Sequence, residues 1–79
     1  MSSVLDRADL FYKEGTSDKV YHATLEKSGN GYIVNYAYGR RGSTLKTGTK
    51  TASPLPEHKA REVFDKLVGE KTAKGYQYT

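Results

Sequence analysis

The sequence predicts an α+β domain: a small antiparallel β-sheet of four to five strands with one amphipathic C-terminal helix packed on one face. Two patterns indicate this fold. The N-terminal part alternates apolar and polar residues in short segments separated by turn-forming Gly, Asn and Ser. Beyond Pro54 and Pro56, apolar residues recur instead with helical spacing. A chain of 79 residues is long enough for one small domain.

The strands are predicted from the alternation and from the turns between them. We expect four strands, over residues 9–13, 19–27, 32–40 and about 45–51. The Gly- and Asn-rich turn at 28–31 suits the positive φ angles of a tight hairpin. The side chains expected to face the core are Tyr21, Ala23 and Leu25 from the second strand and Tyr32, Val34 and Tyr36 from the third.

Residues 57–74 are predicted to form the helix. Its apolar face consists of Ala60, Val63, Phe64, Leu67 and Val68, with charged residues at most other positions. Proline is tolerated in the first turn of a helix, and Gly75 is expected to end it in a left-handed conformation. Residues 76–78 are expected to form a short final extended segment. Tyr76 is expected to make the hydrophobic contact that accompanies a glycine cap.

The chain is predicted to comprise a flexible leader over residues 1–8 and a single domain over residues 9–79. No stretch approaches the roughly 20 apolar residues of a membrane helix, so we expect a soluble, cytoplasmic protein with no membrane partner. The absence of cysteine and the wide separation of two histidines predict no disulfide, no metal and no cofactor. His22 and His58 have no nucleophilic or acidic partner at a spacing that would indicate catalysis. We therefore expect no catalytic residues, no enzymatic activity and no small-molecule substrate.

The end of the third strand is the strongest candidate for a binding site. Tyr38 can stack on a base or sugar, and the guanidinium of Arg40 can bind a phosphate through two parallel hydrogen bonds. Gly39, between them, lets a ligand approach the backbone closely. Four cations beside the neighbouring turns are candidates for a basic rim: Lys19, Arg41, Lys46 and Lys50. The net charge of +4 adds a mild preference for anionic partners.

The same residues also fit a purely structural interpretation. Tyr38 can cap the core, Gly39 can mark a strand end, and Arg40 can be an ordinary solvated charge. Lysines on edge strands also discourage sheet-to-sheet aggregation. Both interpretations stay open at the level of sequence.

Several segments in order resemble the WGR domain family over about residues 9–77. They are Ser17–Tyr21, Gly31–Asn35, Tyr38–Gly42, Thr47–Thr51 and Glu70–Tyr76. The family is named for a Trp-Gly-Arg triplet, whose first position here is Tyr38, followed by Gly39 and Arg40. WGR domains occur in DNA-damage-dependent poly(ADP-ribose) polymerases and in small bacterial proteins.

The resemblance implies nucleic-acid binding without catalysis. In the polymerases the domain helps to bind DNA breaks near the 5′ end, and the triplet contributes to those contacts. For this chain we therefore expect a module that binds DNA ends or nicks. Two alternatives use the same surface: a protein-interaction module, because Tyr and Arg are enriched in interface hot spots, and an RNA-binding module, because sheet aromatics stack on single-stranded bases.

Overall fold

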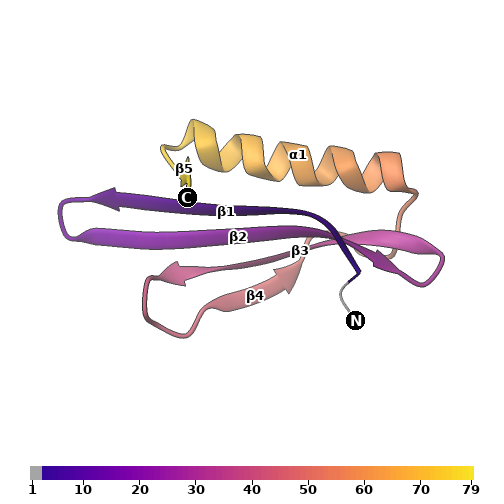
Figure 1. Ribbon diagram of the computed structural model, residues 1–79, viewed down its shortest axis with the longest axis horizontal. Helices are drawn as coiled ribbons and strands as arrows, with labels where there is room; N and C mark the ends of the chain where they lie inside the picture. Colours follow the sequence, from indigo (N-terminus) through magenta and orange to yellow (C-terminus); the bar gives the residue numbers. More distant parts are fainter. Residues whose placement is uncertain (1–2) are drawn as a thin grey trace.

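The computed structural model describes residues 3–79 and shows an antiparallel five-stranded sheet with one helix along one side (Figure 1). The elements are β1 (Val4–Glu14), β2 (Ser17–Ser28), β3 (Gly31–Arg40), β4 (Lys46–Thr49), α1 (Glu57–Ala73) and β5 (Gln77–Tyr78). The strand order is β4-β3-β2-β1-β5, because α1 carries the chain back across the sheet to β1. This architecture confirms the predicted α+β class.

The first strand starts earlier than the predicted Asp9. Residues 4–8, which the sequence analysis assigned to a leader, pair with β2 through a register irregularity near Asp6. The adjacent charges of Asp6 and Arg7 hide the strand alternation there. Residues 1–2 of the predicted leader lie outside the described residues. At the other edge of the sheet, β4 is shorter than predicted.

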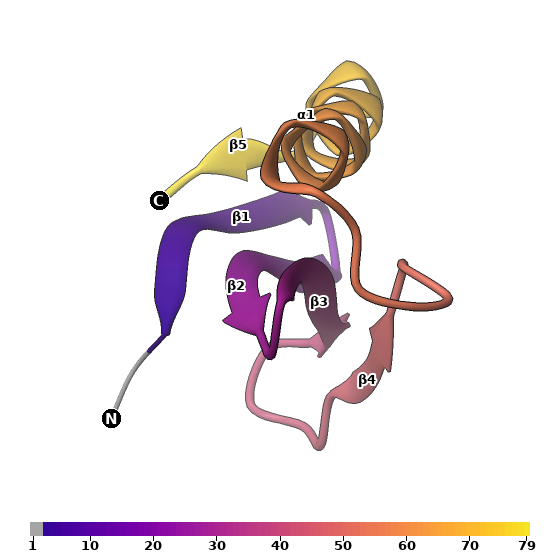
Figure 2. The same cartoon turned by 90° about the vertical axis from the view of Figure 1, so that its right-hand side faces the viewer.

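The hydrophobic core lies between α1 and the sheet. The sheet contributes residues that are fully buried, and the helix contributes one buried row; together they include Leu10, Leu25, Val34, Ala60, Phe64, Leu67 and Val68. Figure 2, a view along the helix, shows the sheet curving away beneath α1, with β4 far from β1 and β5. Within the described residues, no helix is long and apolar enough to cross a membrane.

The register of β2 and β3 continues the core face beyond the helix. Leu25 lies opposite Val34, and further along the ladder Tyr21 lies opposite Tyr38. Directly paired residues in a sheet share a face, so these tyrosines lie on the same side as the buried aliphatic pair. The β1–β2 hairpin extends past the C-terminal end of α1 (Figure 1). The aromatic part of the face is therefore only partly covered by the helix.

Candidate functional site

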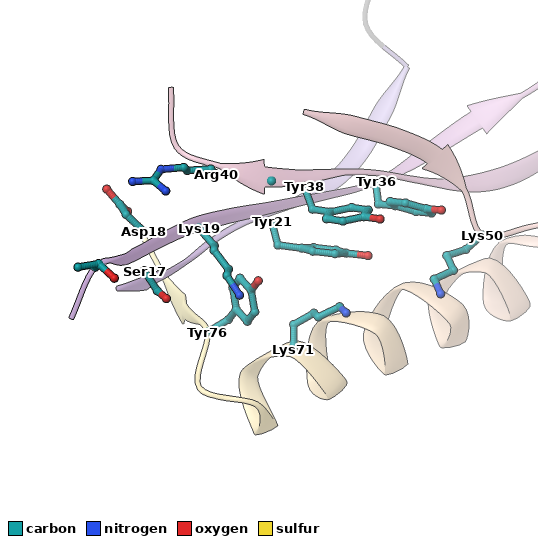
Figure 3. Close-up of a pocket in the computed structure, with 12 residues that line it drawn as sticks. Ser17, Asp18, Lys19, Tyr21, Tyr36, Tyr38, Arg40, Lys50, Lys71 and Tyr76 are labelled. Atoms are coloured by element: carbon teal, nitrogen blue, oxygen red, sulfur yellow. The ribbon is translucent and has the colours of Figure 1, made fainter. Parts of the chain in front are cut away.

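An open cleft of about 700 Å³ lies where the sheet extends past the end of α1. Its floor consists of three tyrosine rings from β2 and β3 (Figure 3). The ring of Tyr21 is nearly parallel to those of Tyr36 and Tyr38, with centroids 6.1 Å and 5.7 Å away. The centroids of Tyr36 and Tyr38 are 6.0 Å apart. Tyr21 is buried, whereas Tyr38 is 38% exposed and presents its ring to the cleft.

The end of α1 forms the opposite wall. The Tyr76 amide donates to the carbonyl of Lys71, and the Gly75 amide donates to that of Thr72. This pair of bonds is the Schellman motif, and Gly75 has the positive φ of 106° that it requires. The predicted glycine cap is thus confirmed. It turns the chain so that Tyr76 meets Tyr21 edge-on, with ring centroids 6.2 Å apart.

Two glycines allow the strands to hold this arrangement. A Cβ at Gly48 would overlap the hydroxyl and ring of Tyr36, so the missing side chain leaves room for that ring against β4. Gly39 has a φ of 154°, and a Cβ there would lie 3.2 Å from the side chain of Leu45. The glycine between Tyr38 and Arg40 is therefore needed for local backbone geometry and packing.

Cations surround the tyrosine floor. The ammonium group of Lys71 lies 4.8 Å from the ring centroid of Tyr21, and that of Lys50 lies 5.7 Å from the centroid of Tyr36. Both distances are in the cation–π range. Lys19 and Arg40 are paired across β2 and β3 at the other end of the cleft. In the part of the chain that the structure describes, none of these four cations forms an ion pair.

The arginines differ in whether they form an ion pair with a carboxylate. Arg7, Arg41 and Arg61 each pair with an aspartate, at N···O distances of 3.0, 3.0 and 2.6 Å. Arg40 is the exception among the described residues, and its exposed side chain lines the cleft. Its guanidinium is therefore available to an external anion.

Packing changes the titration of two cleft residues. Burial, followed by the neighbouring Tyr36 and Tyr38, raises the pKa of Tyr21 to about 12, so this phenol is neutral at physiological pH. Burial, followed by the charges of Lys74 and Lys50, lowers the pKa of Lys71. The negative charge of a bound anion would offset both the cost of burial and the repulsion felt by that ammonium group.

The structure brings most of the sequence-predicted site residues together. Those that line the cleft are Tyr38, Gly39, Arg40, Lys19 and Lys50. Arg41 does not line it, and its Nε donates at 3.0 Å to the carboxylate of Asp18, which does line the cleft. Lys46 lies opposite Tyr38 on the edge strand β4, and it is exposed outside the cleft.

Sequence reasoning did not assign seven of the cleft residues to the site: Thr16, Ser17, Asp18, Tyr21, Tyr36, Lys71 and Tyr76. The alternation correctly places Tyr21 and Tyr36 on the core face, but it does not indicate where the helix stops covering that face. Lys71 follows the apolar row of α1 at helical spacing from Leu67. That position is the one signal that could have directed it toward the sheet.

Outside the cleft, the polar face of the sheet carries a second set of contacts. The His22 Nδ1 lies 2.7 Å from the Asp9 carboxylate, which also accepts from Arg7. The described residues contain no group of three His, Cys, Asp or Glu that could hold a metal ion.

The fold is thus a small helix-on-sheet domain with an open cleft that has a tyrosine floor and unpaired cations among the described residues. The model of the WGR domain family matches residues 5–79, nearly the whole chain. The protein therefore belongs to the WGR domain family, a class of small nucleic-acid-binding modules rather than catalytic domains. Searches of curated proteins and of solved structures gave no significant match.

Proposed function

We propose that this domain is a non-catalytic module that binds DNA ends or nicks through the tyrosine cleft. The observation that carries the proposal is that the partly exposed ring of Tyr38 lines the same cleft as Arg40, an arginine without an ion pair among the described residues. An aromatic face and a free guanidinium in one cleft match the sugar or base face and the phosphate of a strand terminus.

The preference for ends follows from access to the rings. In a continuous duplex each base is stacked on both faces, and the cleft floor cannot reach a base or sugar face without unstacking it. At an end one face is already free, and at a nick the broken backbone lets the two flanking bases separate more easily. Tyr38 can then stack on that face while Arg40 binds the terminal phosphate. Stacking of this kind contributes about 1–3 kcal/mol per base.

An amide chemical-shift titration with short duplexes tests this function. One blunt duplex carries a 5′ phosphate, a second lacks it, and a third has both ends closed by hairpin loops. We expect shifts concentrated at residues 38–40, largest with the phosphorylated open end and nearly absent with the closed one. Diffuse shifts that follow all lysines and ignore the ends would contradict the proposal.

Arg40→Gln provides the matching variant, with Lys66→Gln as control. Lys66 is exposed on α1 and does not line the cleft. We expect Arg40→Gln to weaken binding of the open duplex and to reduce the slope of log K against log salt by about 1, because one phosphate contact is lost. Lys66→Gln should leave both quantities close to wild type. Equal effects of the two substitutions would place the site elsewhere.

A protein-interaction module is the second candidate. Tyr78, on the edge strand β5, is 63% exposed and lies outside the cleft. An exposed tyrosine on a strand edge is a typical anchor for a protein partner. This function predicts a partner whose capture resists salt and depends on Tyr78 rather than Arg40.

The RNA-binding alternative is distinguished from DNA binding by competition between matched RNA and DNA strands for the domain.

A further inference from the structure

The cleft has cations at both ends of its tyrosine floor. The proposed binding of DNA ends uses only the cations at one end of this floor. Along the ladder of β2 and β3, the Lys19–Arg40 pair comes first, then Tyr21–Tyr38, then Ala23–Tyr36. Each step of two residues along a strand is roughly 6.6 Å, so the first and third pairs lie about 13 Å apart. Lys50 and Lys71 lie at the far end, over the rings of Tyr36 and Tyr21.

The side chains of Lys50 and Lys71 point toward each other across this end of the cleft (Figure 3). Lys50 comes from the segment after β4 and Lys71 from the last turn of α1, so only the tertiary fold brings them together. Their positive charges repel, and burial and this repulsion lower the pKa of Lys71. No carboxylate in the described residues forms an ion pair with either ammonium group.

We propose that Lys50 and Lys71 form a second phosphate-binding pair, so that the cleft holds an unpaired nucleotide with phosphate on both its 5′ and 3′ sides. The proposal rests on the proposed function, and it specifies the ligand further. One phosphate is bound by Arg40 with Lys19, the base or sugar lies on the tyrosine rings, and the other phosphate lies between Lys50 and Lys71. The preferred DNA end therefore carries a short single-stranded tail rather than a flush terminus.

The competing explanation is that the two lysines only cover the tyrosine rings. Cation–π contacts at a partly exposed site contribute about 0.5–1 kcal/mol each, which is enough to hold a lysine in place without any ligand. The two explanations differ in what neutralising Lys71 does. Loss of a ring contact lowers the stability of the free domain alone. Loss of a phosphate contact removes the preference for a ligand with two phosphates.

The test compares thymidine 3′,5′-bisphosphate with thymidine 5′-monophosphate by chemical-shift titration at fixed ionic strength. For the wild-type domain we expect the bisphosphate to bind about tenfold tighter, as one additional charge-assisted contact implies. Lys71→Gln should abolish this preference while keeping the weaker monophosphate binding. Its helix cap should survive, because Lys71 takes part in it only through its backbone carbonyl. Lys66→Gln is the control on the same helix and should keep the tenfold preference.

The outcomes test the second phosphate pair and the end-binding function separately. Equal affinity of the wild-type domain for the two nucleotides overturns the second phosphate pair, and so does a preference that survives in Lys71→Gln. If the open phosphorylated duplex nevertheless binds, the end-binding function stands. A bisphosphate preference that is lost in Lys71→Gln supports the pair. If it occurs without any binding of open duplexes, it overturns the end-binding function instead.

Discussion

The face of the sheet that carries α1 is divided into two halves of different chemistry. Under the helix it is aliphatic, and Leu25 and Val34 have no exposed surface. Toward the end of α1 the same two strands carry Tyr21 opposite Tyr38, and the floor becomes aromatic, open and surrounded by lysines. Register and side-chain direction are the same in both halves. The difference is set by where the helix ends.

The cations of the two halves also differ. Beside the aliphatic half, Arg61 on α1 pairs with Asp6 on β1, which neutralises its charge within the fold. Around the aromatic half Arg41 is paired with Asp18, whereas Arg40, Lys50 and Lys71 lack such partners among the described residues. Paired charges contribute to the fold, whereas these cations are free to bind an external anion. The comparison suggests that stability and binding can be changed separately.

Leu25→Ala is expected to have the largest effect, and only on stability. Leu25 is fully buried, so truncation removes packing and leaves a cavity, at a cost of about 2–5 kcal/mol in the free energy of unfolding. Urea unfolding measures this loss. Where the variant is folded, its affinity for the open phosphorylated duplex should match wild type. A large loss of affinity in the folded variant would show that the two halves are coupled.

Gly48→Ala should disrupt the packing of the aromatic half. Its methyl group would overlap the ring of Tyr36, which must then turn away from β4. We expect about 1–3 kcal/mol lower stability and weaker duplex binding. Gly69→Ala is the matched control, because that position on α1 has open space around it and alanine is the better helix former. It should be neutral or slightly stabilising, with unchanged binding.

Tyr38→Ala should show the opposite behaviour to Leu25→Ala. Its partly exposed ring contacts Tyr21 and Tyr36, so removing it should lower the free energy of unfolding by about 1 kcal/mol, less than Leu25→Ala does. Loss of a stacking surface should weaken binding of the open duplex by about 1–3 kcal/mol. Titration of the variant with the phosphorylated duplex gives this number. Unchanged affinity would remove Tyr38 from the interface and leave it a structural role.

Much of the aliphatic half could be predicted from the sequence, except for the start of β1, where Ala8 belongs to the core. Alternation identified the inward residues of β2 and β3, and the helical spacing identified Phe64 and Leu67. The Gly- and Asn-rich turn predicted their hairpin, and prolines marked the start of α1. These signals are local, so they need no knowledge of the remaining chain.

The aromatic half could be predicted only in part. Tyr38 and Arg40 are neighbours in sequence, and their joint position follows from one strand. Lys71 and Tyr76 reach the cleft through the angle at which α1 crosses the sheet and through the cap that ends it. Tertiary packing sets that geometry, and local patterns do not encode it. The pairing of Arg41 with Asp18, which removes that arginine from the site, likewise depends on the turn conformation.

Tyr21→Phe tests the aromatic half through the pH dependence of the free energy of unfolding. The raised pKa of Tyr21 means that its contribution to stability is fully present below the ordinary value of 10.0 and is lost as pH rises toward about 12. Over that range the wild-type domain should lose up to about 1.4 kcal/mol per pH unit more than Tyr21→Phe. Urea unfolding at a series of alkaline pH values measures the difference. Tyr78→Phe, at an exposed position, should follow the wild-type curve.

Asp6→Asn should have the smallest effect, and only beside the aliphatic half. The pKa of Asp6 is lowered by the side chain of Arg61 and then by the backbone amide of Arg7, which outweigh burial. A lowered pKa contributes stability above the ordinary value of 3.8, and this contribution is lost as pH falls through the folded-state pKa. Because the pair is half-exposed, the loss at neutral pH should stay below about 1 kcal/mol.

The pH dependence shows whether Asp6→Asn acts through the loss of a charge or through packing. Unfolding curves of wild type and variant should differ at neutral pH and converge in acid, where the wild-type carboxyl is protonated as well. Affinity for the open duplex should be unchanged, because Asp6 does not line the cleft. A constant difference at all pH values would mean that the side chain acts through packing rather than charge. Tighter duplex binding by the variant would mean that the released Arg61 contributes to the interface, and the paired cations would then not be confined to the fold.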